Sequence, residues 1–237
     1  MEFTLVVKMR KLTRSRIRRY FPRALYDGML LHLPYLYRTP VIAYESHMYD
    51  ALDRLLEIAT QIKNVEGDII ECGAARCGTS CLIGLHLRAN RIKKKIYALD
   101  SFGRGFDRRE LQDEVHDGLT TAEITHFTYN SIEYVRKKIR RLGLDGYILP
   151  VDGWFRETLP TVRGPFSFAI IDCDLGRSTS ECLEYVWQRI SKGGVMLIDD
   201  YASTDYQGVK KALDRFLQEK IAQVSHVHMA NRFEVWK

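Results

Sequence analysis

The stretch FSFAIIDCDL, residues 166–175, decides the fold of this protein, because it joins a buried strand to a pair of acids. Its first half is apolar and uncharged, which is typical of a strand that is covered on both faces of a sheet. Two carboxylates, Asp172 and Asp174, follow directly. Further along the chain, the stretch GGVMLIDDYA, residues 193–202, repeats the pattern and includes Asp199 and Asp200. The chain therefore twice ends a hydrophobic strand in two closely spaced acids.

The segments around these two strands alternate between helical and strand patterns. We expect helices over residues 45–62, 78–88, 131–143, 180–194 and 208–220, with Gly143 as a C-terminal cap. We expect strands over residues 68–72, 93–100, 166–172, 195–201, 224–230 and 232–237, and a further one within 146–155. Residues 103–120 are charged and contain glycine, which predicts a loop or a mobile insert.

This alternation predicts an α/β fold. Strands that alternate with helices form a parallel sheet with helices on both faces. The last two strands form a tight pair, so one of them should be antiparallel. We therefore expect a seven-stranded, mostly parallel sheet with a terminal antiparallel strand.

The chain length and composition favour one domain with an N-terminal extension. The 237 residues, 46% of them hydrophobic, are enough for one large α/β domain, and there is no Gly/Ser-rich linker. We expect that domain over residues 45–237. Residues 1–44 are basic and then apolar, and we interpret them as a lid or an oligomerisation segment, which predicts a homo-oligomer.

The charge of the chain is concentrated near its beginning. Residues 1–40 hold nine basic and two acidic side chains, whereas the whole chain has a net charge of +6. Such an arm could bind nucleic acid or anionic lipid. We favour the solvated face of a helix, because the apolar, aromatic stretch LYDGMLLHLPYLY follows.

Other features point to a reduced compartment and no membrane span. No run reaches the roughly 20 apolar residues that cross a bilayer, and MEFTLVVKMRKL does not resemble a signal peptide. The five cysteines are odd in number and lie in apolar patterns, so we expect reduced thiols and a cytoplasmic protein. A metal site at Cys72, Cys77 and Cys81 is disfavoured, because there is no C-x-x-C pair and no nearby histidine.

The ends of the first three strands predict an adenosine-type cofactor. Ligands bind at the carboxyl ends of strands in such sheets. Gly73 and Gly78 would let a ligand approach the backbone, although a simple strand-to-helix turn needs them too. Asp100 is placed to accept hydrogen bonds from ribose hydroxyls, or else to cap a helix. The loop at Asp152 and Trp154 suits an adenine ring, and Trp154 packed against the core is an equal alternative.

The ends of the fourth and fifth strands predict a metal site. These ends are neighbours in a parallel sheet, so Asp172, Asp199 and Asp200 would repel one another without a cation. Oxygen ligands select a hard divalent ion such as Mg²⁺. The alternative is that the aspartates cap the helices that follow. We favour the metal, because so many acids at two adjacent strand ends exceed what capping requires.

Six motifs in this order resemble the macrocin O-methyltransferase family: GDIIECGAARCGTS, YALDSF, DGWFRETLP, IDCDLGRSTSECL, GGVMLIDDY and GVKKALDRFL. The resemblance runs from about Thr39 to Lys237. It implies a single Rossmann-like (class I) methyltransferase domain. It also implies an enzyme that uses S-adenosylmethionine and Mg²⁺ to methylate sugar hydroxyls of natural products.

The resemblance further implies which residues bind each group. Those around the cofactor would be Thr39, Glu71, Gly73, Ala74, Gly78, Asp100, Ser101, Asp152, Gly153 and Trp154. Those on Mg²⁺ would be Asp172, Asp199 and Asp200. On mechanistic grounds we expect Asp172 to be the catalytic base as well, with Asp174 as the alternative base, since a nearby carboxylate can take the hydroxyl proton. His47 and residues 103–127 would lie over the acceptor pocket. Where the family usually has DLYEST, this chain has DLGRST, which puts the usual acceptor in doubt.

We therefore expect an O-methyltransferase that acts on a hydroxyl of a sugar or another natural-product acceptor with the help of Mg²⁺. A dehydrogenase is disfavoured, because G-x-G-x-x-G is absent. A nucleic-acid methyltransferase using the basic arm is disfavoured, because the fourth strand ends in DCDL and not in [D/N]-P-P-[Y/F]. A module that binds the cofactor without turnover remains a third reading.

Overall fold

The structure is a computed structural model that describes residues 48, 51–107, 109–111, 128, 130–220, 225–229 (backbone only) and 231–237. Three features expected from the sequence lie outside these residues: the N-terminal segment 1–44 with Thr39, the side chain of His47, and most of the insert 103–127.

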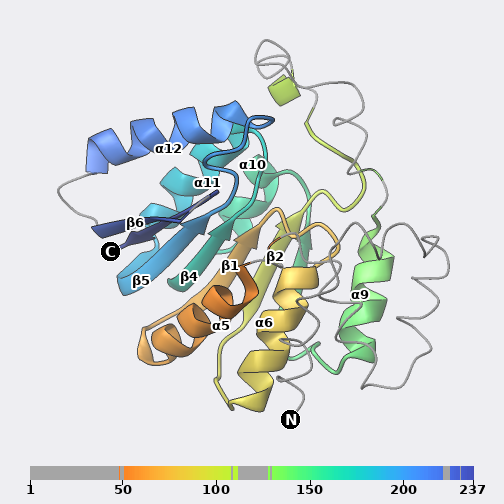
Figure 1. The fold of residues 1–237 in the computed structure, drawn as a ribbon. Coiled ribbons are helices and arrows are strands. Elements are labelled where there is room, and N and C mark those ends of the chain that lie inside the picture. The colour runs from red at the N-terminus through yellow and green to blue at the C-terminus, as the bar shows by residue number, and fades with distance from the viewer. Residues whose placement is uncertain are drawn as a thin grey trace, which may run out of the picture.

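A sheet in the order β3-β2-β1-β4-β5-β7-β6 forms the centre of the protein (Figure 1). Its strands are β1 (Asp68–Cys72), β2 (Ile96–Asp100), β3 (Ile148–Asp152), β4 (Phe166–Ile171), β5 (Ile190–Ile198), β6 (Ser225–Met229) and β7 (Arg232–Trp236). The first five strands pair in parallel, and β7 pairs antiparallel with β5 and with β6. The predicted α/β fold, mostly parallel with a terminal antiparallel strand, is confirmed.

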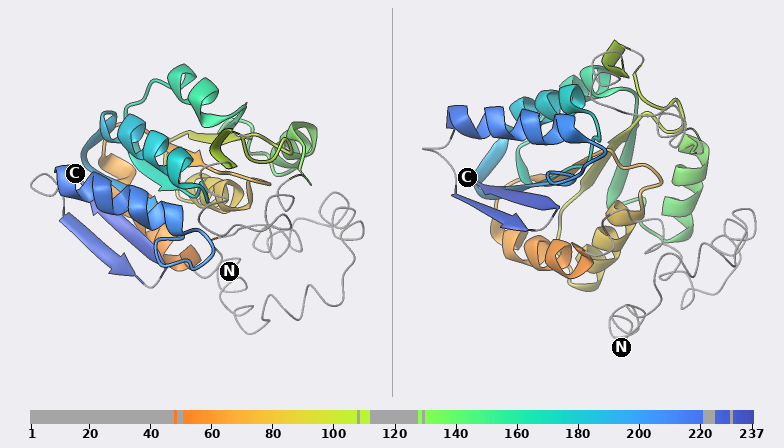
Figure 2. Two further views of the ribbon diagram at one scale, coloured as in Figure 1. Left: turned by 90° about the horizontal axis from the view of Figure 1, so that it is seen from above. Right: turned by 45° about the horizontal axis from the view of Figure 1, so that its top comes forward.

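Helices cover both faces of the sheet, as Figures 1 and 2 show. The helices on one face are α5 (Leu52–Gln61), α6 (Gly78–Ala89) and α9 (Ile132–Arg141); those on the other are α10 (Phe155–Thr158), α11 (Gly176–Trp187) and α12 (Gln207–Lys220). Short 3-10 turns follow α5 (Ile62–Asn64) and α10 (Leu159–Thr161). The residues described include no helix that is long and apolar enough to cross a membrane.

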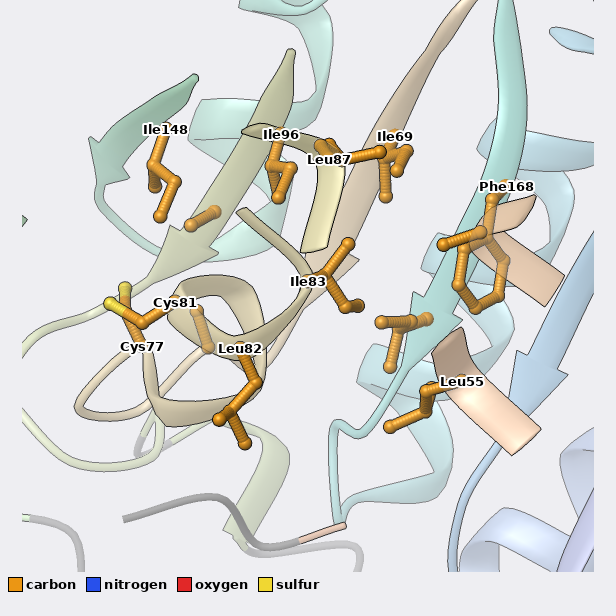
Figure 3. Packing of buried hydrophobic residues seen from close by; sticks show 14 of the residues in the cluster. Leu55, Ile69, Cys77, Cys81, Leu82, Ile83, Leu87, Ile96, Ile148 and Phe168 are labelled. Atoms are coloured by element: carbon orange, nitrogen blue, oxygen red, sulfur yellow. The ribbon is translucent and has the colours of Figure 1, made fainter. Parts of the chain in front are cut away.

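Successive residues of the central strands pack into two separate cores. Ile69 belongs to the core under α5, α6 and α9, whereas its neighbour Ile70 belongs to the core under α11 and α12. Figure 3 shows the first core, where Ile83 of α6 packs near Ile69 and Phe168 of the sheet. Burial of both faces accounts for the continuous apolar runs of these strands.

The predicted boundaries of one helix and of the strand that follows it are wrong. The helix expected over 180–194 spans Gly176–Trp187, and β5 already begins at Ile190. The stretch SKGG, residues 191–194, was expected to end the helix but lies within β5. It forms a bulge there, as the shift in register with β4 between Phe166 and Phe168 shows. Gly193 has a φ of +80° there, which glycine adopts without strain. The predicted cap at Gly143, with a φ of +64° after the end of α9, is confirmed.

Candidate active site

The loop after β1 is shaped by its backbone and held by side chains from other elements. Gly73 has a φ of +92°, and its N–H and that of Ala74 donate to the carbonyl oxygen of Leu99 at 3.0 and 3.1 Å. Ala75 and Cys77 also have positive φ values, 44° and 55°. Such residues are strained unless their surroundings hold them.

Two side chains from the α9 region bind consecutive carbonyl groups of this loop. The amide of Asn130 donates to the carbonyl oxygen of Ala75, and the ammonium group of Lys138 donates to that of Arg76. Lys138 is completely buried. The sequence reasoning missed both residues. Lys138 follows Val135 at the three-residue spacing that marks the apolar face of a helix, so a signal for its burial was present.

Glu71 lies buried at the end of β1 and accepts a hydrogen bond from the hydroxyl of Ser80 in α6. Burial raises the pKa of Glu71 to about 8, because a charged carboxylate loses its hydration there. The hydrogen bond from Ser80 opposes this rise only in part. Glu71, two residues before the loop that begins at Gly73, is therefore a carboxyl group that can hold a proton near neutral pH.

Asp100 links the ends of β1 and β2. Its Oδ2 accepts from the N–H of Ala75 at 2.8 Å, and its Oδ1 accepts from the N–H of Phe102 at 2.7 Å. Burial raises its pKa. The helix-cap alternative does not apply, because no helix begins within residues 101–107. Ser101 donates to the carbonyl oxygen of Gly105 at 2.8 Å and so fixes the turn beside Asp100.

The loop after β3 lies beside the loop after β2. The N–H of Gly153 donates to the carbonyl oxygen of Asp100 at 3.0 Å. Asp152 forms an ion pair with Arg104. The guanidinium groups of Arg104 and Arg156 each lie 5.2 Å from the ring centre of Trp154. The ring N–H of Trp154 is buried and has no hydrogen-bond partner among the described residues.

Three acids converge where β4 and β5 end. One carboxylate oxygen each from Asp172, Asp174 and Asp200 lies within 4.8 Å of the others. Burial raises the pKa of all three; for Asp172 the charge of Asp199 adds to the effect, and for Asp174 that of Asp200 does. A divalent cation would offset this repulsion, and carboxylate oxygens are the ligands that Mg²⁺ prefers. The donor set therefore fits Mg²⁺.

Asp199, expected among the metal ligands, has a different neighbour. Its Oδ1 lies 3.0 Å from Nε of Arg232, and its Oδ2 accepts from Nη2 at 3.3 Å. Asp174, which the sequence offered only as an alternative base, joins the cluster instead. The structure thus brings Asp172 and Asp200 together as expected, whereas Asp199 forms an ion pair with the guanidinium group of Arg232 in β7.

The described part of the insert contacts the helices next to the acids. Asp107 pairs with Arg156 of α10, and Glu110 accepts from the hydroxyl of Ser178 in α11. Asp107 and Glu110 are both buried. Ser178 belongs to the DLGRST stretch that departs from the family pattern. These contacts place Glu110 beside the start of α11 and Asp107 beside α10, positions that the sequence could not give.

Comparison with solved structures identifies the class of this fold. The O-methyltransferase NovP superimposes with a TM-score of 0.71 at 20% identity, covering 100% of this chain and 99% of that one. The calicheamicin methyltransferase CalS11 superimposes with a TM-score of 0.68 at 15% identity, and the match covers 94% of this chain and 93% of that one. The sheet, with a loop and acids at its carboxyl edge, is therefore of the methyltransferase type.

The model of the macrocin O-methyltransferase (TylF) family matches residues 38–236. The chain belongs to this family, as its motifs indicated. A 4′-O-methyltransferase of a rhamnosyl tetracenomycin from Streptomyces olivaceus is 34% identical over 149 residues, 58% of this chain and 54% of that protein. The mycinamicin III 3″-O-methyltransferase of Micromonospora griseorubida is 32% identical over 149 residues, which are 58% of this chain and 56% of that protein. The chain thus aligns with about half the length of these relatives.

Proposed function

We propose that this protein transfers a methyl group from S-adenosylmethionine to a hydroxyl group of a sugar or another natural-product acceptor, with Mg²⁺ bound beside the acceptor. The observation that carries the proposal is the convergence of Asp172, Asp174 and Asp200 at the same sheet edge as the loop after β1. Family membership supports it, as do the names of relatives that methylate glycosylated natural products. Solved neighbours include complexes with S-adenosylhomocysteine and S-adenosylmethionine.

In this proposal the first three strand ends bind the cofactor. Each carboxylate oxygen of Asp100 accepts one hydrogen bond from a backbone N–H, Oδ2 from Ala75 and Oδ1 from Phe102. Each oxygen has a second lone pair, which can accept a hydrogen bond from a ribose hydroxyl. The methionine part would lie against Glu71, Gly73, Ala74 and Gly78, with Ser101 beside the ribose. The adenine would lie by Asp152, Gly153 and Trp154. Thr39 is proposed to contact the cofactor's carboxylate.

The carboxylates hold the acceptor and take its proton. Mg²⁺ would be bound by Asp172 and Asp200, with Asp174 and Asp199 as the further candidates; when bound, it lowers the pKa of a coordinated hydroxyl. S-adenosylmethionine would supply a methyl group on a sulfonium sulfur: the carbon–oxygen bond would form as the carbon–sulfur bond breaks, and the sulfur would keep the electron pair and leave as the thioether of S-adenosylhomocysteine. The hydroxyl proton passes to Asp172, or to Asp174 as the alternative base.

The test is calorimetric titration with S-adenosylhomocysteine, with and without Mg²⁺, on the wild type and on Asp100→Ala. We expect binding by the wild type and its loss in the variant, because the variant loses the ribose acceptor and the contact with Ala75. Absence of binding to folded wild-type protein would refute the proposal. Binding without turnover across a panel of hydroxylated acceptors would favour the binding-module alternative.

Two properties stay predictions from the sequence. The homo-oligomer rests on the apolar segment within residues 1–44, and light scattering would test it. The cytoplasmic location rests on the cysteines, all five of which are free and buried. A gel shift that weakens steeply with salt would revive the nucleic-acid alternative.

A further inference from the structure

Asn231, just before β7, and Arg232, its first residue, contact the two adjacent acids that follow β5. The amide Nδ2 of Asn231 donates to Oδ1 of Asp200 at 2.9 Å. Arg232 engages both oxygens of Asp199, with Nε 3.0 Å from Oδ1 and Nη2 3.3 Å from Oδ2. Each acid of the pair therefore has its own partner at the start of the neighbouring antiparallel strand or directly before it.

The backbone fixes this arrangement. β5 and β7 pair antiparallel with Ile198 opposite Phe233. The N–H of Tyr201 donates to the carbonyl oxygen of Asn231 at 2.9 Å, and the N–H of Ala202 donates to its side-chain Oδ1 at 3.1 Å. Because Oδ1 accepts from a backbone N–H, the amide cannot turn over, and Nδ2 must face Asp200. Asn231 therefore sets the direction of the Asp200 carboxylate.

Arg232 has two opposed effects on the same site. It is 8% exposed and Asp199 is 5% exposed, so the pair lies inside the protein, where an unpaired carboxylate would be costly. The guanidinium thus stabilises Asp199. It is also a positive charge beside the cluster that would receive a divalent cation, and it engages both oxygens of one candidate ligand. A cation at this site must overcome that charge.

We propose that Arg232 and the divalent cation compete for Asp199, and that Asn231 is a positioning residue that presents Asp200 to the cation. This inference rests on the cation site of the proposed function. In this arrangement Arg232 sets the affinity for the cation. It neutralises Asp199 in the absence of the cation, and binding of the cation requires Asp199 to exchange this partner.

The two residues should then have opposite effects on cation affinity. Arg232→Gln removes a buried positive charge and frees Asp199, so Mn²⁺ should bind about tenfold more tightly or better. Asn231→Ala removes the group that orients Asp200, and loss of such an outer partner typically weakens metal binding about tenfold or more. Arg215→Gln is the matched control, since it makes the same change at an exposed position of α12.

The experiment is titration of Mn²⁺ into the wild type and the three variants, followed by calorimetry and by the loss of the free-ion electron paramagnetic resonance signal. The melting temperature without added cation should fall in Arg232→Gln, because Asp199 loses its partner, while the rise on adding Mn²⁺ should exceed that of the wild type. If Arg232→Gln does not fold, Arg232→Lys keeps the charge but loses the planar guanidinium group, and a smaller gain in affinity is expected.

The outcomes separate two failures. If the wild type binds no Mn²⁺, the proposed cation site is itself wrong, and this inference falls with it. If the wild type binds Mn²⁺ but the folded Arg232 variant binds it equally or less tightly, the competition is refuted and the cation site stands. An Asn231→Ala variant with wild-type affinity would refute the positioning role of Asn231.

Discussion

The hydroxyl of Ser80 donates a hydrogen bond to the carboxylate of Glu71, and both side chains are buried. Burial raises the pKa of Glu71 from 4.5 to about 8 in the folded protein. Between these values the folded state holds a proton that the unfolded chain releases. The free energy of unfolding should therefore decrease as the pH rises through this window, by up to about 1.4 kcal/mol per pH unit, and level off above it.

Urea unfolding of the cofactor-free wild type and of Glu71→Gln, followed between about pH 5 and pH 8, isolates this contribution from other titrating groups. The amide keeps the acceptor for Ser80 but has no proton to lose. The two proteins should be similarly stable near the acid end, and the variant should be the more stable near the alkaline end. Parallel pH profiles would contradict the assignment.

Gly73→Ala should strongly destabilise the fold. A Cβ atom at this position would lie 1.7 Å from the carbonyl oxygen of Asp172, and the φ of +92° is unfavourable for alanine. We expect a loss of about 3 kcal/mol or more from the strained backbone and the overlap together. Gly146→Ala is the control, because a Cβ there meets nothing within 4 Å. Equal urea midpoints for the two variants would be inconsistent with this packing.

Lys138→Met should weaken binding of S-adenosylhomocysteine roughly tenfold, because a charged hydrogen bond to the loop carbonyl of Arg76 is lost. Methionine keeps the apolar stem of the buried lysine. Lys137→Met makes the same change at the exposed neighbouring position and should leave the affinity unchanged. Calorimetric titration of both variants measures the difference, and equal affinities would show that the loop does not depend on Lys138.

Gly176→Ala tests the packing of α11 on α12. Helix propensity alone would favour alanine by up to about 1 kcal/mol. A Cβ at Gly176 would, however, lie 2.7 Å from the backbone carbonyl oxygen of Gly208, so we expect a net loss of about 1–3 kcal/mol. Gly84→Ala in α6 should cost less, because its Cβ would meet the movable side chain of Ile148 at 3.2 Å. A stabilised Gly176 variant in urea unfolding would disprove the close contact.

The strand ends were predictable because local pattern determines them. The apolar runs before Cys72, Asp100 and Asp172 end where the structure ends β1, β2 and β4, to within a residue. The start of α11 was not predictable, because Gly176 and Arg177 resemble a turn in the sequence, and the close approach of Gly208 to Gly176 appears only in the fold. Long-range contact, and not propensity, decides that boundary.

The partners of the acids could not be read from the sequence. Asp199 and Arg232 are 33 positions apart, and only the register between β5 and β7 brings them together. The same holds for Glu110 and Ser178, which are 68 positions apart. The acids themselves were visible as paired residues after strands, but which carboxylates converge depends on backbone turns, such as the left-handed conformations of Asp174 and Asp200.

The contact between Gly73 and the backbone of Asp172 also works as a spacer. In the proposed reaction the methyl donor would lie on the β1 side of this contact and the attacking oxygen on the β4 side. Because main-chain atoms meet there, this separation does not depend on any side-chain rotamer. New acceptors could therefore be accommodated by changing side chains such as Asp107, Glu110 and Ser178, while the distance between methyl donor and acceptor oxygen would stay the same.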